Sequence, residues 1–581
     1  MAQTIRRRPT KRRKSLAARL LVPVVSVLFL LLFGFGLIFY IRHYAPTDER
    51  MELSEYYRLK NDDTTVIIIN GEYITKDEDN EFGLVSGGAA YLELATVKEY
   101  LDNGYVFDDR DGILRYATDE EVVSAQVDET GYTVGRDTRT LSVPIVIKAH
   151  DKVFLAADFV REFTDLSYTL CEEAPARIVL EKAGYEHTVA SVKSKTAIRR
   201  LGGPKSKVLK DSLRGDTVTI LGTVGKWSNV LTEDGVIGYV KSGRLKNKQV
   251  ISTEATLPER NYTHNLLDKT VVLGWHQTTN QTANEGLSSI LERTGNINVI
   301  SPTWFYMNDN NGGIESHSSS AYVQSAHARG IQVWGLISNF EDSTVDTASV
   351  LNRTTSRDNL VNNIVGAAIA VGMDGINLDI ELLPEDAADG YAAFIRELSL
   401  KCKKNDLILS VDVGVPTSWN GYYDRTNLSN YCDYVIVMAY DEHYGGDEEA
   451  GSTASLPWVR EGIVKTLESV PAGQVVLGIP FYSRVWSQKD GELSTSAIHM
   501  SAIPDYMERH DLKQQWRDKE EQNYVEYTED GTKYMLWIED ATSIGERLTV
   551  MKENALAGCA FWKLGNEPES IWDVINDYGE Q

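Results

Sequence analysis

The spacing of hydrophobic residues changes several times along the chain, and each change indicates a different kind of element. Residues 20–41 are almost continuously apolar, with Pro23, Ser26 and two glycines as the only interruptions. A helix needs about 20 apolar residues to cross a bilayer, so this run predicts one transmembrane helix. Residues 42–64 are polar and charged and are predicted to form a linker.

From residue 268 to the C-terminus, short apolar runs alternate with stretches of helical periodicity. The predicted strands are 270–275, 298–304, 332–338, 375–381, 407–415, 434–440, 475–482 and 558–563. Helical patterns fall between them, for example at 319–329, 357–371, 390–403 and 458–468. Eight such repeats predict an α/β fold, a (β/α)8 TIM barrel, whose usual length is about 250 residues. The surplus before the last strand predicts a small α+β insertion, with a hairpin at 523–539 around the turn 529–531.

Two smaller regions precede the predicted barrel. Within 65–188, residues 91–101 resemble residues 153–163, and each segment has the pattern of a strand that runs into an amphipathic helix. The repeat predicts a duplicated α+β module. Residues 189–248 alternate short β-like runs with glycine turns, which predicts a small β-rich barrel. Residues 249–267 are polar and are predicted to form a second linker.

The charge is unevenly distributed. The chain has a formal net charge of -25, yet its first 41 residues contain eight Lys and Arg residues and no acid. Basic residues before an apolar run stay in the cytoplasm, so the tail 1–19 is predicted to lie inside and everything after residue 41 outside the cell. A cleaved signal peptide and a buried core helix are the alternatives; the length of the run and the poor cleavage site after it favour an uncleaved anchor in the cell membrane. The acidic body disfavours a nucleic acid as partner.

Cysteine and histidine spacing gives no indication of a metal site. The four cysteines are scattered, without a CxxC pair, and the histidines are not spaced as ligands. We therefore expect neither a metal nor another cofactor.

The most informative segment for chemistry is the predicted strand that ends in Asp379 and Glu381. Side chains alternate along a strand, so these two acids point to one side and the intervening isoleucines and leucine to the other. Adjacent like charges raise the pKa of one member, which keeps one carboxyl protonated. A protonated carboxyl beside an ionised one can cleave an acetal such as a glycosidic bond. The alternative is a strand that simply ends in solvated acids.

The other predicted strand ends support a sugar site. Chemistry in a TIM barrel is located at the C-terminal ends of its strands. Aromatic residues occupy several of these ends, and the sixth strand ends in a Met-x-Tyr-Asp sequence: Trp275, Trp304, Met438, Tyr440, Asp441, Tyr482 and Trp562. Each aromatic residue alone is more typical of a core position than of a ligand contact, but their shared placement favours stacking on sugar rings.

These motifs resemble glycoside hydrolase family 18, the family of chitinases and endo-N-acetylglucosaminidases. The family's fourth-strand pattern Asp-Gly-x-Asp-x-Asp-x-Glu corresponds to residues 374–381, its Met-x-Tyr-Asp to residues 438–441, and its eighth-strand tryptophan to Trp562. One position departs from the pattern, because Asn377 stands where many chitinases have the middle aspartate. The departure resembles a branch of spore-cortex and peptidoglycan-cleaving enzymes.

The resemblance implies substrate-assisted, retaining hydrolysis. Glu381 would be the general acid and then the base, Asp379 would bind the substrate's acetamido N–H, and Tyr440 would position its carbonyl. Asn377 would hold Asp379 by a hydrogen bond. Substrate contacts are expected from the remaining positions: Asn377, Trp562, Met438, Asp441, Trp275, Trp304 and Tyr482.

The preceding regions carry resemblances of their own. Residues 65–188 loosely resemble a wall module named after the N-terminal domain of copper amine oxidases, and residues 189–248 resemble a bacterial SH3-like barrel, which would bind cell wall. A plain structural barrel with Trp227 in its core is the alternative. The whole pattern predicts a membrane-anchored, extracellular glycosidase acting on peptidoglycan. A glycan-binding protein without activity and a structural assembly factor are the competing hypotheses.

Overall fold

The computed structural model describes residues 16–59, 64–76 and 81–579, so most of the predicted basic tail lies outside the described residues. Contacts divide the chain into two units. One comprises residues 1–102 and 147–258, and the other comprises residues 103–146 and 259–581. Each unit is described separately below.

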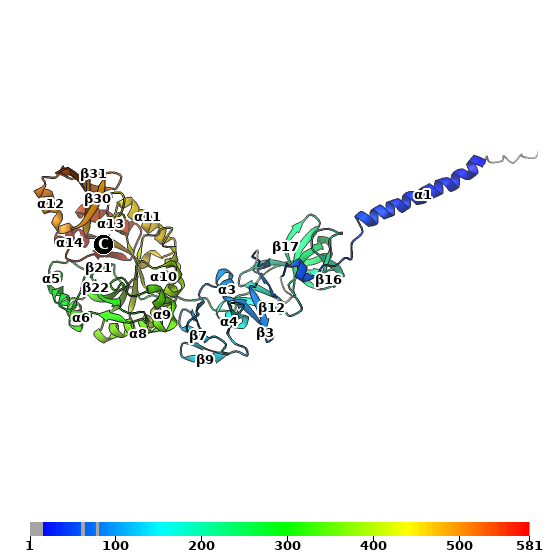
Figure 1. Cartoon of the computed structure of the whole chain (residues 1–581), viewed down its shortest axis with the longest axis horizontal. Helices are drawn as coiled ribbons and strands as arrows, with labels where there is room; N and C mark the ends of the chain where they lie inside the picture. Colours follow the sequence, from blue (N-terminus) through cyan, green and yellow to red (C-terminus); the bar gives the residue numbers. More distant parts are fainter. Residues whose placement is uncertain (1–15, 60–63, 77–80, 580–581) are drawn as a thin grey trace, which may run out of the picture. The chain divides into compact units, whose positions relative to one another are not determined.

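Eight parallel strands of the second unit close into a barrel (Figure 1). They are β21 (Val271–His276), β22 (Val299–Met307), β24 (Gln332–Ser338), β25 (Gly375–Asp379), β26 (Ile408–Gly414), β27 (Tyr434–Met438), β28 (Val475–Pro480) and β34 (Gly558–Trp562). The first strand pairs with both β22 and β34, which closes the ring. The predicted TIM barrel is confirmed, and all eight predicted strands are present with small shifts at their ends.

Helices surround the strands and bury their outer face (Figure 1). They are α5 (Leu287–Leu291), α6 (Ser320–His327), α7 (Thr347–Asn352), α8 (Thr354–Val371), α9 (Ala388–Lys403), α10 (Arg425–Tyr431), α11 (Leu456–Leu467), α13 (Ala541–Glu553) and α14 (Ile571–Gly579). One apolar core lies between helices and strands, and a second, which includes Trp275, Trp334 and Tyr434, fills the barrel interior. Strands buried on both faces explain why the sequence shows them as nearly continuous apolar runs.

The insertion before the last strand is larger than the sequence predicts. It forms a five-stranded antiparallel sheet of β29 (Tyr482–Lys489), β30 (Glu492–His499), β31 (Gln515–Arg517), β32 (Gln522–Glu529) and β33 (Thr532–Ile538), with α12 (Ile503–Arg509). The predicted hairpin at 523–539 is confirmed as β32 and β33. Its turn has positive φ at Asp530 and Gly531, as a two-residue hairpin turn requires.

A five-stranded meander from residues 103–146 belongs to the barrel unit. It consists of β5 (Val106–Asp108), β6 (Ile113–Ala117), β7 (Val122–Gln126), β8 (Gly131–Val134) and β9 (Asp137–Thr140). The short β23 (Ile314–Ser316) belongs instead to the barrel sheet, where it pairs with β22. The carboxylate of Asp108 accepts a bond from the backbone N–H of Thr354 (2.6 Å), at the start of α8. The buried guanidinium of Arg396 donates to the carbonyl of Gly104 (2.9 Å). These bonds attach the meander to the helices of the barrel.

The first unit contains the predicted repeat as a symmetrical pair. β4 (Ala89–Glu93) leads into α3 (Leu94–Tyr100), and β11 (Lys152–Ala156) leads into α4 (Ala157–Phe163). β4 and β11 pair antiparallel, so the two copies are also neighbours in space. The remaining elements are β3 (Gly83–Ser86) and β10 (Val146–Ala149) in the same sheet, and β1 (Val66–Ile69), β2 (Glu72–Tyr73), β12 (Leu166–Cys171) and β13 (Arg177–Lys182) in another.

The same unit holds a seven-stranded sheet over residues 186–252. Its strands are β14 (Glu186–Val192), β15 (Thr196–Arg199), β16 (Val208–Ser212), β17 (Thr217–Val224), β18 (Trp227–Thr232), β19 (Ile237–Lys241) and β20 (Leu245–Ser252). Small apolar residues fill its core, whereas Trp227 is only half-buried, with Lys241 over its ring. Residues of the predicted first linker pack in this unit, since Met51 and Tyr57 are buried, and α2 (Leu53–Tyr56) lies between them.

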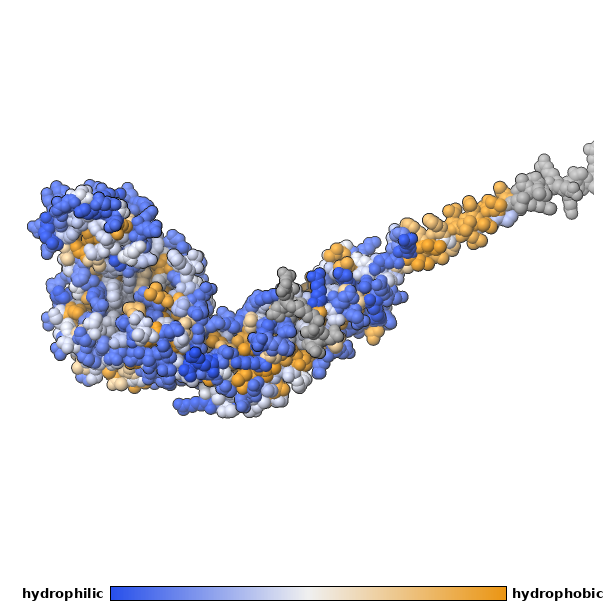
Figure 2. All heavy atoms as spheres, viewed as in Figure 1, coloured by the Kyte–Doolittle hydropathy of each residue, from blue (hydrophilic) through white to orange (hydrophobic). Residues whose placement is uncertain are grey.

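The apolar run forms a single helix, α1 (Leu16–His43). Its segment Leu21–His43 is long and apolar enough to cross a membrane, with a mean hydropathy of 2.7, and none of it is buried within the protein. Figure 2 shows this apolar surface. The helix fits a signal anchor or a signal peptide.

Candidate active site

Asp379, the last residue of β25, and Glu381, two residues after it, face a cavity at the C-terminal end of the barrel. The isoleucine and leucine side chains around them pack in the outer core, so Asp379 and Glu381 point to the inner side, as their alternation predicts. The backbone of Glu381 is held by Asn339, whose side chain accepts from its N–H and donates to its carbonyl, both at 2.9 Å. This pairing fixes the direction of the Glu381 side chain.

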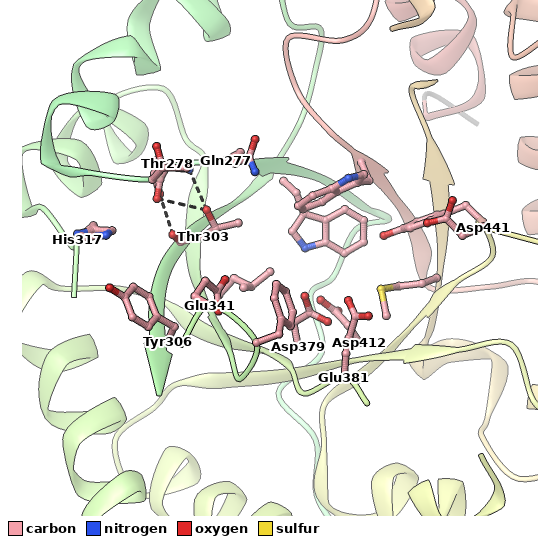
Figure 3. Close-up of a pocket in the computed structure, with 17 residues that line it drawn as sticks. Gln277, Thr278, Thr303, Tyr306, His317, Glu341, Asp379, Glu381, Asp412 and Asp441 are labelled. Atoms are coloured by element: carbon pink, nitrogen blue, oxygen red, sulfur yellow. Dashed lines mark hydrogen bonds between the residues drawn. The ribbon is translucent and has the colours of Figure 1, made fainter. Parts of the chain in front are cut away.

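The cavity has a volume of about 580 Å³ and is lined by residues from most of the strand ends (Figure 3). Seven of the ten predicted site residues line it: Glu381, Asp379, Tyr440, Trp562, Met438, Asp441 and Trp275. The rings of Trp275 and Trp562 meet edge to face at 6.0 Å. Trp275 itself is almost completely buried, so Trp562 is the more accessible aromatic surface.

A second cavity of about 300 Å³ lies beside the first. Glu381, Asp412 and Met438 line both, so Glu381 stands at the boundary between them. The second cavity is also lined by Tyr422 and by Trp419, whose side chain is 78% exposed. An exposed indole beside a cavity offers an apolar face to a sugar ring.

The electrostatics of the site favour protonated acids. Burial raises the pKa of Glu381, and the charges of Asp441 and Glu341 raise it further. Burial also raises the pKa of Asp379 well above its usual range, with added effects of Asp412 and Glu381. Glu381 can therefore carry a proton at a pH where an exposed glutamate is ionised, which a general acid requires.

Tyr440 and Asp441 follow the sixth strand. Burial raises the pKa of Tyr440 well above its usual range, so its hydroxyl stays a hydrogen-bond donor. Asp441 has a positive φ of 57° and accepts bonds from the hydroxyl of Tyr482 (2.7 Å) and the guanidinium of Arg484 (2.8 Å). Arg484 belongs to the insertion, which thereby contributes directly to the site.

Three predicted substrate contacts do not line the cavity. Trp304 is fully buried in the outer core, where its Nε1 donates to Asn284 (2.8 Å), because the strand end turns it away from the barrel axis. Tyr482 is buried and holds Asp441 instead of facing the cavity.

The third residue, Asn377, is fully buried. The expected hydrogen bond from its amide to Asp379 is not formed. It donates to Asp412 and Ser410 of β26 instead. The pleat explains the difference: Asn377 and Asp379 are two residues apart on one strand, whereas the next strand brings other side chains closer to the amide.

Several lining residues are not predicted from the sequence. They are Asp412, Glu341, Phe340, Tyr306, His317, Gln277, Thr278, Thr279, Thr303 and Leu336. Asp412 and Ser410 alternate with valines and leucines in an otherwise apolar strand, and this alternation is a signal for inward polar groups. Thr303 and Tyr306 lie within β22 and Leu336 within β24, whereas the remaining residues follow strand ends in loops whose course depends on packing. Among the described residues, no group of three or more His, Cys, Asp or Glu side chains is placed to hold a metal ion.

A TIM barrel with a carboxylate pair and aromatic residues at its C-terminal end defines the class of protein, a glycoside hydrolase. The sequence profile of glycosyl hydrolases family 18 matches residues 272–567, and the chain belongs to this family. The recognised pattern at residues 374–381 is thus confirmed as part of a family 18 domain.

Three of the proteins to which the chain is similar come from species of Bacillus. The uncharacterized glycosylase YvbX of Bacillus subtilis is 28% identical over 48% of this chain and 88% of its own length. The cortical fragment-lytic enzyme of the same organism is 26% identical over 39% of this chain, which spans about half (55%) of that relative. Among solved structures, the spore cortex-lytic enzyme SleL of Bacillus cereus has a TM-score of 0.49 and 18% identity, over 60% of this chain and 79% of that chain.

Proposed function

We propose that this glycoside hydrolase cleaves peptidoglycan at the bond after an N-acetylglucosamine residue. One observation carries the proposal: Oδ1 of Asp379 is buried beside Glu381 and has no hydrogen-bond partner within the described part of the chain. A buried acceptor that stays unpaired costs about 1–3 kcal/mol. The N–H of an acetamido group on the bound sugar would satisfy it, which favours an N-acetylated substrate.

In the proposed mechanism, the substrate supplies its own nucleophile. Glu381 donates its proton to the glycosidic oxygen as the bond to the anomeric carbon breaks, and the leaving sugar departs with a new hydroxyl group. The acetamido oxygen attacks the anomeric carbon and forms an oxazolinium ion. The ionised Glu381 then takes a proton from water, whose oxygen opens the ring, so the configuration is retained and Glu381 is protonated again.

Two neighbouring side chains would stabilise the intermediate. Asp379 accepts the acetamido N–H and, when ionised, offsets the positive charge of the oxazolinium ring. Tyr440 donates its hydroxyl to the acetamido oxygen and orients it toward the anomeric carbon. Trp562 forms the floor under the sugar. In this mechanism, the sugar that is attacked would occupy the larger cavity, and the leaving sugar would occupy the cavity lined by Trp419.

The preceding elements would place the enzyme at the wall. We propose that α1 anchors the chain in the cell membrane with the N-terminus in the cytoplasm, because basic residues flank its start. The seven-stranded sheet of residues 186–252 would act as an SH3-like module that binds cell wall. The cortical fragment-lytic relative supports a wall glycan as substrate.

Digestion of purified peptidoglycan followed by mass spectrometry tests the proposal. We expect fragments with N-acetylglucosamine at the new reducing end. A matched sample whose acetyl groups have been removed chemically should resist, because it lacks the nucleophile. N-acetylmuramic acid at the new ends, or equal cleavage of both samples, would refute the proposal. Protease treatment of intact cells would test the orientation, since an extracellular barrel should be degraded.

A further inference from the structure

The amide of Asn377 is completely engaged inside the barrel. Its oxygen accepts from Trp275 Nε1 of β21 (2.9 Å) and Ser301 Oγ of β22 (3.0 Å), two strands that are not its direct neighbours in the sheet. Its nitrogen donates to two oxygens of the adjacent β26, Ser410 Oγ (3.1 Å) and Asp412 Oδ1 (2.7 Å). An asparagine side chain has two N–H donors and one carbonyl acceptor, so no donor remains for Asp379. The shortest of the four bonds fixes Asp412.

Asp379 and Asp412 are neighbours on adjacent parallel strands. β25 and β26 pair with Leu378 opposite Val411, so the next residues, Asp379 and Asp412, also lie opposite each other and point to the same side. Both are buried, with 7% and 2% exposure, and both line the larger cavity. Figure 3 shows the two carboxyl groups side by side, next to Glu381.

No ion pair neutralises these two acids within the described residues. Burial raises the pKa of Asp412 well above its usual range, although the hydrogen bond from Asn377 opposes this effect. The charge of Asp412 in turn adds to the raised pKa of Asp379. Neighbouring carboxylates in a buried site disfavour each other's ionisation, so this pair favours a state with one proton between the two acids.

We propose that Asp412 is a positioning residue for the hydrolysis: it shares one proton with Asp379, and Asn377 holds it in place from the middle of the fourth strand. The proposal rests on the proposed function for the role of Asp379. When the acetamido N–H binds, Asp379 must be the ionised member. Its O–H bond then breaks as an O–H bond forms on Asp412, and the total charge of the pair does not change.

The arrangement also explains why asparagine suits position 377. An amide donates to Asp412 without adding a third negative charge to the buried group. The carboxylate that supports Asp379 therefore comes from β26 and not from its own strand. The exchange variant N377D/D412N would return this carboxylate to the fourth strand. The proposal can therefore be tested both by removing the carboxylate and by moving it to the neighbouring strand.

The first test measures initial rates of reducing-end release from purified peptidoglycan between acidic and alkaline pH. In Asp412→Asn, Asp379 loses its acidic neighbour, so we expect kcat to fall about tenfold to hundredfold and the acid limb of the rate profile to move down by about one pH unit. KM should stay within about twofold, because the change acts on transition-state charge. The exchange variant should restore at least part of kcat and return the acid limb toward its original position.

Asp433→Asn is the matched control. It removes another buried aspartate, which accepts backbone bonds at the start of β27, outside both cavities. It should leave the acid limb unchanged. If Asp412→Asn also leaves the acid limb unchanged, or if the exchange variant is no better than Asp412→Asn, Asp412 has only a structural role and the proposal is wrong.

A second measurement needs no substrate. Infrared spectra of the full-length protein at pH 7 report protonated carboxyl groups, and we expect Asp412→Asn and Asp379→Asn to lose the same component of that signal, since either change removes the shared proton. Unchanged spectra would overturn the proposal. If the signal is lost but peptidoglycan is not cleaved by the unaltered enzyme, the shared proton is supported and the proposed substrate fails. If Asp412→Asn does not fold, the infrared spectrum of Asp379→Asn alone tests the shared proton.

Discussion

The guanidinium of Arg484 lies 2.8 Å from Oδ1 of Asp441 and joins the insertion to the end of the sixth barrel strand. The same carboxylate raises the pKa of Glu381 through its charge. Arg484 thus influences the proposed general acid without touching it, through an aspartate that borders the cavity.

Replacing Arg484 with leucine should therefore shift the alkaline limb of the rate profile upward. Without the guanidinium, the charge of Asp441 acts more strongly on Glu381 and keeps it protonated to higher pH. We expect kcat to fall about tenfold, since Asp441 also loses a support. Arg517→Leu, which removes a surface arginine from the same insertion, is the control, and an identical profile for both variants would contradict the idea.

Glu381→Gln should remove the general acid while preserving the shape of the side chain. We expect reducing-end release from peptidoglycan to fall about 100-fold to 10,000-fold, the usual contribution of acid–base catalysis. Glu385→Gln changes an exposed glutamate nearby, outside both cavities, and should retain full activity. Activity of Glu381→Gln within a few-fold of the unaltered enzyme would rule out its proposed role.

Trp419→Ala tests whether the second cavity receives the leaving part of the glycan. Stacking of a sugar on an exposed indole contributes about 1 kcal/mol, so KM for long glycan chains should rise roughly fivefold. A short substrate with a small leaving group should be cleaved as before. Trp516→Ala removes another exposed tryptophan, on β31 and outside both cavities, and is the control. An equal rise in KM for Trp516→Ala would contradict a specific role of the second cavity.

The buried His276 should make the barrel unit less stable at acidic pH. Burial lowers the pKa of His276 to about 4 from 6.5, and its Nδ1 lies 2.8 Å from the hydroxyl of Tyr322. His276 therefore binds a proton more readily in the unfolded chain than in the folded protein. The stability that the neutral imidazole contributes is fully present above pH 6.5 and is lost as the pH falls toward 4. The shift corresponds to roughly 3 kcal/mol at most.

Thermal unfolding at pH 7 and pH 4.5 measures this effect. His276→Gln should narrow the difference between the two midpoints, because glutamine does not titrate. The exposed His499→Gln serves as the control and should keep the full difference. An unaltered pH dependence in His276→Gln would show that other groups determine the acid sensitivity.

The meander of residues 103–146 should be needed for a stable barrel unit. A fragment that starts at residue 259 loses the acceptors of two bonds, the Gly104 carbonyl to which Arg396 donates and the Asp108 carboxylate to which the Thr354 N–H donates. Each buried polar group left without its partner costs about 1–3 kcal/mol, so the unfolding midpoint should fall clearly. In the full chain, Asp108→Ala should destabilise by about 1 kcal/mol, and the exposed Asp137→Ala should not.

The sequence by itself determined the barrel and the centre of its site. Strands of a parallel barrel are buried on both faces, so their apolar runs are visible in the chain, and the acids at their ends stand out against them. Asp379, Glu381 and Tyr440 could be assigned to one cavity because every strand presents its C-terminal end on the same side. The hairpin at 523–539 was predictable for a similar reason, since its turn is a local signal.

Only the tertiary structure decided which side chains meet across strands and between distant segments. The bond from Asn377 to Asp412 depends on the register of β25 with β26, and the support of Asp441 by Arg484 depends on the fold of the insertion. Residues 103–146 join the barrel unit although they lie inside the predicted duplicated module. These contacts arise from packing between segments far apart in the chain, and no local pattern records them.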